Sequence, residues 1–110
     1  MSYEQIQFQV VANLRAQIDR WYTKKNGYLF EQRHLHANCQ DVIDRCSKVI
    51  DYIRSFIGYI AEDRIDPSDY QGTGWYFSFD DAAQKFVIVR EQKDGIEISD
   101  APIQAFYVHD

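Results

Sequence analysis

The sequence has few of the residues that mark disulfide-stabilised or loop-rich proteins. Its 110 residues include only two cysteines, two prolines and five glycines. Cys39 and Cys46 are seven positions apart in a stretch with helical periodicity, which separates their Cα atoms by about 10.5 Å. A disulfide requires a separation below about 7 Å. We therefore expect two free thiols and a reducing compartment.

The sequence also lacks the long apolar runs of exported and membrane proteins. Polar residues follow Met1 at once, without the basic start and apolar core of a signal peptide. The most apolar stretch, residues 49–61, is too short to cross a bilayer and contains Asp51 and Arg54. We expect a cytoplasmic protein with no membrane association, and a single domain, because 110 residues is close to the usual domain size.

Positive charge is scarce in the C-terminal part of the chain. Residues 1–62 carry eight Lys or Arg against seven Asp or Glu, a net charge of +1, whereas residues 63–110 carry four against ten, a net charge of −6. Nucleic-acid binding depends on the neutralisation of phosphates by basic side chains, so we do not expect it here. An acidic surface favours a partner with a basic one.

A helical hydrophobic period is present over roughly the first sixty residues. Ser2 and Gln5 have the spacing of a capping box, and apolar residues then recur at three- and four-residue steps, which predicts a helix over residues 3–26. Asn26 and Gly27 are residues that commonly end a helix. A second, more regular stripe runs from Cys39 to Ile60, and its helix begins either at Asn38 or nearer Tyr28.

The last thirty-five residues alternate apolar and polar side chains with a period of two. Asp66 before Pro67 predicts the start of a short helical turn. Strands are predicted at residues 75–79, 86–90 and 96–99, with a fourth, edge strand at residues 104–108. The predicted fold class is α+β: two long antiparallel helices followed by a three- to four-stranded antiparallel meander packed on them. Within the single domain, residues 1–62 form the helical hairpin, 63–74 a connector and 75–110 the sheet.

The length of the helices predicts self-association. A 25-residue helix is about 37 Å long, and a small sheet is not expected to cover two apolar stripes of that length. A homodimer through the helices, completing a four-helix arrangement, would cover them.

No group of residues has the spacing of a catalytic, metal or phosphate-binding motif. His34, His36, Cys39 and Cys46 are ligand types, but Cys46 lies too far along the helix to reach the same ion, and free cysteines are commonly buried. We expect no metal, no cofactor and no enzymatic activity.

Two functional hypotheses remain. The first is a small non-enzymatic protein that occupies a basic protein partner, as inhibitors of nucleases, immunity proteins and phage-encoded blockers of host defence do. The binding surface would consist of acidic and aromatic side chains in the C-terminal part, a combination that is common at protein interfaces. A simpler interpretation is that the aromatic residues belong to the core and the acidic residues to turns. The residues concerned are Asp66, Asp69, Tyr70, Tyr76, Asp80 and Asp81.

The second hypothesis is a homo-oligomer that binds a small anionic, nucleotide-like ligand between its subunits. It rests on basic residues placed around the bend between the predicted helices, which a charged and exposed loop would also explain. These residues are Arg20, Lys24, Lys25, Arg33, His34 and His36.

Overall fold

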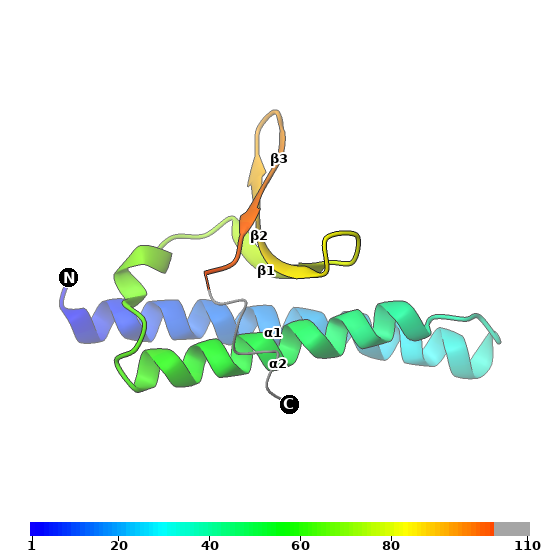
Figure 1. Cartoon of the computed structure of the whole chain (residues 1–110). Helices are drawn as coiled ribbons and strands as arrows, with labels where there is room; N and C mark the ends of the chain where they lie inside the picture. The colour runs from blue at the N-terminus through cyan, green and yellow to red at the C-terminus, as the bar shows by residue number, and fades with distance from the viewer. Residues whose placement is uncertain (103–110) are drawn as a thin grey trace.

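The computed structural model describes residues 1–102, which fold into two helices and a three-stranded antiparallel sheet (Figure 1). The sheet order is β1-β2-β3, as in a meander. The predicted α+β layout is confirmed, and the predicted strand at residues 104–108 lies outside the described residues. The elements are α1 (Tyr3–His34), α2 (Gln40–Ala61), the 3₁₀ helix η1 (Pro67–Tyr70), β1 (Trp75–Asp80), β2 (Lys85–Gln92) and β3 (Gly95–Asp100).

The first helix is longer than the sequence predicted. The predicted capping box is present, since Ser2 Oγ accepts the Gln5 N–H and the Gln5 side chain accepts the Ser2 N–H. The predicted end at Asn26 is wrong, because α1 continues to His34. A glycine inside a helix costs only about 1 kcal/mol, and Gln32 in the last turn of α1 accepts the Cys39 N–H at the start of α2 at 3.1 Å. The reversal instead uses His36, whose φ of 56° is left-handed.

The second helix begins at Gln40, close to the Asn38 alternative, with Cys39 in the N-cap position. It ends in a Schellman motif, in which the Asp63 N–H donates to the Ile60 carbonyl and the Arg64 N–H to that of Tyr59. Asp63 takes the left-handed position of this motif with φ 58°, where glycine is the usual residue.

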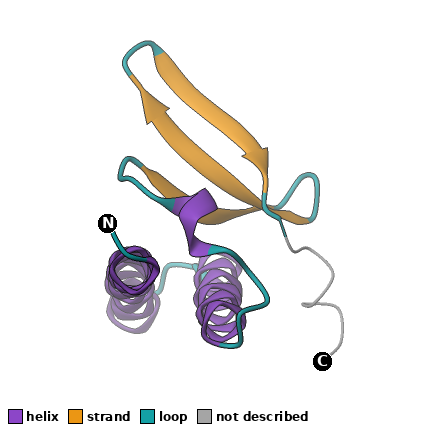
Figure 2. Cartoon of the chain, turned by 90° about the vertical axis from the view of Figure 1, so that its left-hand side faces the viewer, coloured by secondary structure: helices purple, strands orange, loops and turns teal. Residues whose placement is uncertain are grey.

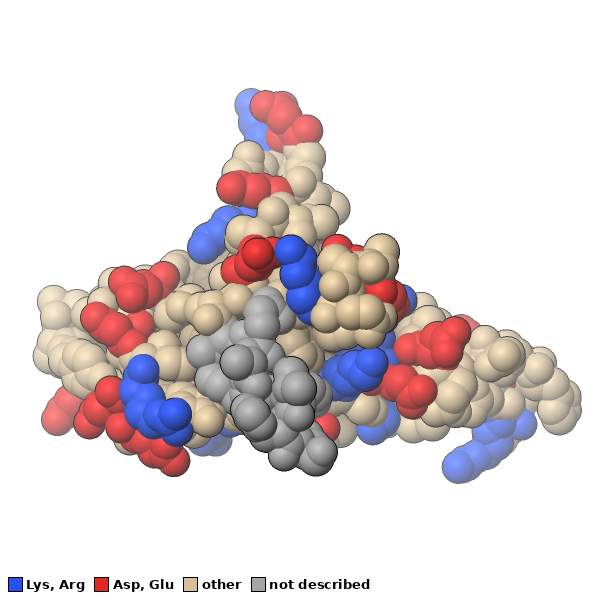
Figure 3. Space-filling view, viewed as in Figure 1, with Lys and Arg blue, Asp and Glu red and all other residues tan. Residues whose placement is uncertain are grey.

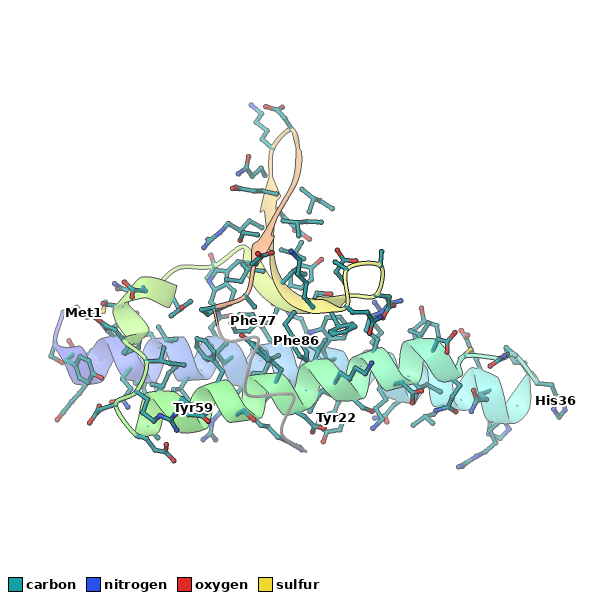
Figure 4. All side chains as sticks on the ribbon, viewed as in Figure 1. Met1, Tyr22, His36, Tyr59, Phe77 and Phe86 are labelled. Atoms are coloured by element: carbon teal, nitrogen blue, oxygen red, sulfur yellow. The ribbon has the colours of Figure 1, made fainter. Side chains whose placement is uncertain are left out.

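One face of the sheet packs into the groove between the two helices (Figure 2). The centre of this core is a group of aromatic rings: Tyr52 stacks on Phe86 with ring centroids 4.3 Å apart, and Phe77 lies 5.0 Å from both Tyr52 and Phe56. Figure 4 shows Phe77 and Phe86 above the middle of the helical pair. The apolar stripe of α2 is therefore buried, as the sequence predicted.

The two outer edges of the sheet differ. The free edge of β1 is covered by α1: Gln17 Nε2 donates to the Trp75 carbonyl at 3.3 Å, and Gln17 Oε1 accepts the Phe77 N–H at 3.0 Å. Trp21 Nε1 adds a bond to the Phe77 carbonyl at 3.2 Å. By contrast, the β2–β3 hairpin projects away from the helices (Figures 1 and 2), and every residue of β3 is exposed.

Candidate protein-binding surface

The structure divides the predicted acidic and aromatic set between two places. Asp66, Asp69 and Tyr70 belong to η1 or its N-cap, which lies against the first turns of α1. Asp80 is the last residue of β1 and Asp81 the first of the turn into β2, which sits over the N-terminal half of α2 (Figure 1). These two groups do not form one surface.

The η1 group combines a fixed backbone with an exposed carboxylate. Asp66 Oδ1 accepts the Ser68 N–H at 2.9 Å and the Ser68 hydroxyl at 2.7 Å, and these bonds lower the pKa of Asp66. Tyr70 packs edge-on against Phe56 with centroids 4.9 Å apart, and burial raises its pKa. Asp69 is exposed. The η1 segment therefore presents Asp66 and Asp69 from a position fixed by Tyr70.

The carboxylates of the β1–β2 turn have structural contacts. Asp80 Oδ1 accepts the Ala82 N–H at 3.0 Å and the Ala83 N–H at 3.2 Å, which closes the turn. Asp81 Oδ2 accepts from Nε and Nη2 of Arg45 at 2.8 and 2.6 Å. Asp80 is thus a turn former, and the charge of Asp81 is partly neutralised by α2.

Three exposed apolar side chains that the sequence hypothesis did not include lie beside η1. Phe8 is 75% exposed, Met1 74% and Tyr3 47%. The Tyr3 hydroxyl donates to Asp63 Oδ1 at 3.2 Å. The pKa of Tyr3 is raised, mainly by its partial burial and secondly by this hydrogen bond to a carboxylate. The sequence signal for Phe8 was its absence from the apolar stripe of α1: a phenylalanine on the solvent side of an amphipathic helix has no place in its own core.

A groove runs between α1 and the segment after η1, with a volume of about 320 Å³. Phe8, Asn13 and Tyr70 line it together with Gly72, whose φ of 93° requires glycine. Asn13 Nδ2 is buried and has no acceptor among the described residues. A buried amide donor without a partner costs free energy, which a bound carbonyl or carboxylate could recover.

Acidic side chains lie at the same end of the molecule as this groove. Asp69 lies near Tyr70, and Asp66 and Asp63 lie near Tyr3. Figure 3 shows carboxylates gathered at this end of the molecule, and Figure 4 places Met1 there and His36 at the opposite end of the helical pair. We name this surface the acidic–aromatic end; it consists of Met1, Tyr3, Glu4, Phe8, Asp63, Asp66, Asp69 and Tyr70.

The predicted basic cluster is spread along α1 and does not gather at the bend. Fourteen residues separate Arg20 from His34, about 21 Å along a helix. Lys25 lies 5.9 Å from the Tyr22 ring, whereas Lys24 lies 5.1 Å from that of Trp21. Arg33 is exposed in the last turn of α1, and His36 is exposed in the connector.

Two members of the basic cluster nevertheless share a cavity of about 240 Å³ between α1 and the sheet. Arg20 and Lys24 line it with Tyr76, the remaining member of the predicted acidic and aromatic set. Glu91 also lines it, so the cavity is of mixed charge.

The residues considered as metal ligands lie where α1 connects to α2, in the connector and the adjoining turns of the two helices. Cys39 and Cys46 are free and buried, and burial raises the pKa of both thiols. Cys39 Sγ lies 3.8 Å from Glu31 Oε2, and the His34 ring lies 4.5 Å from that of Phe30. Across residues 1–102, no three His, Cys, Asp or Glu side chains are grouped as a metal site would require. Within the same range, no helix combines the length and apolar character needed to span a membrane.

Comparison of the chain with protein-family models, with curated proteins and with solved structures finds no match.

Proposed function

We propose that this protein is a non-enzymatic binding protein whose acidic–aromatic end captures a basic segment of a protein partner, in the manner of an inhibitor, immunity or anti-defence protein. The observation that carries the proposal is the exposure of Phe8 on the rim of the groove beside Tyr70, at the end of the molecule where Glu4, Asp63, Asp66 and Asp69 lie. Exposed aromatic anchors surrounded by polar residues are typical of protein interfaces. A partner offering an apolar side chain and flanking Lys or Arg residues would complement both features.

The residues now expected to contact the partner differ from the acidic and aromatic set predicted from the sequence. Asp66, Asp69 and Tyr70 remain in it, and Phe8 and Asp63 join them. Asp80 and Asp81 leave it, because they lie at the β1–β2 turn over α2, away from η1 and Phe8.

Affinity capture with matched variants tests the proposal. Phe8→Ser should release a partner that the wild-type protein retains, because truncating a central anchor costs about 2 kcal/mol or more, a roughly 30-fold loss in affinity. Phe30→Ser is the control, since Phe30 is 59% exposed at the opposite end of the helical pair. Equal retention by wild type and Phe8→Ser would contradict the proposal.

The electrostatic part of the proposal has its own control. Asp69→Asn should weaken capture at low salt and have little effect at 1 M salt, where the screening length falls to about 3 Å. Asp81→Asn removes one negative charge outside the acidic–aromatic end and should leave capture unchanged. If both variants behaved alike, net charge would explain the attraction and this surface would not.

The cavity between α1 and the sheet supports a second candidate function, the binding of a small anionic ligand. Arg20 and Lys24 supply positive charge, and Trp21 and Tyr76 supply ring surfaces. Nucleotides and other anionic metabolites in excess should then raise the unfolding temperature, by a free energy of RT ln(1 + [L]/Kd). Arg20→Ala should abolish the shift and Arg33→Ala should retain it. Absence of a shift with every ligand would reject this candidate.

A further inference from the structure

The outer edge of β3 is an open hydrogen-bonding edge among the described residues. The Ala101 N–H donates to the Phe86 carbonyl at 3.1 Å, so the amide of residue 101 points toward β2. Because amides alternate in direction along an antiparallel strand, those of Ser99 and Glu97 also point toward β2. The N–H and C=O groups of Ile96, Ile98 and Asp100 therefore point outward, where residues 1–102 provide no strand beside them.

This open edge also carries two exposed apolar side chains. Ile96 is 65% exposed and Ile98 is 62% exposed. They lie on the same face of the sheet, two positions apart. Ile98 pairs with Val89, which pairs with Tyr76, so an apolar row crosses the sheet and reaches the open edge.

The contrast with β1 indicates that the open edge is a specific feature of this fold. At the β1 edge, two α1 side chains occupy the outward backbone groups of Trp75 and Phe77. Unpaired edges are templates for pairing with another strand, and proteins commonly protect them. Here one edge is protected by side chains, and the other combines exposed isoleucines with backbone groups that have no partner strand among residues 1–102.

We propose that β3 pairs with β3 of a second copy of this chain, antiparallel and centred on Ile98, to form one continuous six-stranded sheet. In this register Ile98 lies opposite Ile98 of the other copy, and Ile96 lies opposite Asp100. Three hydrogen-bonded residue pairs form, with about six backbone hydrogen bonds. The apolar row then runs unbroken from Tyr76 of one copy to Tyr76 of the other.

Charge and the pairing of Ile98 with Ile98 together select this register. Glu97 lies opposite Ser99 of the second copy, so no like charges face each other. Moving the centre by one residue toward the turn would place Glu97 opposite Glu97, and like charges directly opposite are destabilising. Moving it by one residue the other way, to Ser99, would replace the Ile98–Ile98 pair with Ile98 opposite Asp100. Asp100 is already paired with Lys85 of its own chain, with Nζ 2.5 Å from Oδ1. Its charge is therefore compensated where it meets Ile96.

The interface is narrow, so the dimer should dissociate on dilution. Sedimentation equilibrium over a wide concentration range should show a monomer–dimer equilibrium for the wild-type chain. Ile98→Lys should be monomeric over the same range, because the two substituted side chains would face each other. Phe30 is about as exposed as Ile98 and lies near the end of α1, far from β3, so the Phe30→Lys variant should still dimerise. A wild-type chain that is monomeric throughout, or a dimer lost in Phe30→Lys and kept in Ile98→Lys, would overturn the proposal.

A mixture of charge variants tests the register itself. Ile98→Lys and Ile98→Glu should each be monomeric alone and should associate when mixed, since the proposed centre places the two substituted positions face to face. Association of either variant alone as strongly as wild type would exclude the register.

Hydrogen exchange on the unmodified chain requires no substitution. The amides of Glu97 and Ser99 should be protected at every concentration, because they already bond to β2. The amides of Ile96, Ile98 and Asp100 should gain protection only as the protein concentration rises. Protection of these three amides that did not vary with concentration would show that the edge is covered within one chain. This surface is separate from the acidic–aromatic end, so either proposal can fail without the other.

Discussion

Gln17 offers the most direct test of how the sheet is attached to the helices. Its side chain is 2% exposed and makes two hydrogen bonds to β1, as a donor to Trp75 and as an acceptor from Phe77. The amide thus occupies the position that a neighbouring strand would take. Gln17→Leu keeps a side chain of similar size and removes both bonds, which leaves a buried carbonyl and a buried N–H without partners.

The loss of stability in Gln17→Leu can be estimated from the Trp75 carbonyl and the Phe77 N–H, which lose their partners. A buried backbone group left without its partner costs about 1–3 kcal/mol, and relaxation of the edge toward water should reduce the sum. We expect the free energy of unfolding to fall by about 2–4 kcal/mol. For a domain near 100 residues this lowers the unfolding temperature by roughly 10–30 °C.

Urea unfolding followed by circular dichroism measures the loss directly. The midpoint should fall while the denaturant slope stays constant, because the surface exposed on unfolding is unchanged. Gln9→Leu is the matched control, since Gln9 is exposed on the same helix. If Gln17→Leu lost no more stability than Gln9→Leu, the Gln17 bonds would not stabilise the sheet, and the β1 edge would not be protected by them.

Three further predictions concern the ends of the helices and the thiols. Asp63→Gly should raise the free energy of unfolding by about 0.5–1 kcal/mol, since glycine takes the left-handed conformation at lower cost, and should weaken partner capture. The pKa of Asp66 is lowered in the fold, so its contribution to stability is fully present above the unfolded pKa of about 3.9 and is lost as pH falls through the lower pKa of the folded state. Asp66→Asn should therefore flatten stability against pH in acid titrations. Because burial raises the pKa of Cys39 and Cys46, both should react with a disulfide reagent far more slowly in the native state than in urea.

Local signals in the sequence were sufficient for the features that neighbouring residues determine. The Ser2 capping box and the Asp66 cap each involve residues three or fewer positions apart, and both are present. The alternation of β1 and the stripe of α2 likewise follow from short-range periodicity.

Features that depend on distant residues could not be predicted in this way. Gln17 bonds to residues 58 and 60 positions away, so in the sequence it is one polar residue among many in an amphipathic helix. Asn26 and Gly27 favour termination locally, but α1 continues past them to His34, and Gln32 in its last turn bonds to Cys39 seven positions further along the chain. The role proposed for Phe8 depends on where η1 folds back, which brings Tyr70 beside Phe8 and Asp66 near Tyr3.

The two proposed surfaces lead to one further expectation when they are combined. Pairing through β3 would carry two acidic–aromatic ends on one assembly, and a partner surface with two or more basic segments would then be held at both. The second contact becomes intramolecular, which slows dissociation without changing either contact. Ile98→Lys should therefore bind a single immobilised partner site as tightly as wild type, yet dissociate faster from a densely coated surface. Phe8→Ser should weaken binding on sparse and dense surfaces alike, so the pair of variants separates the strength of each contact from the number of contacts.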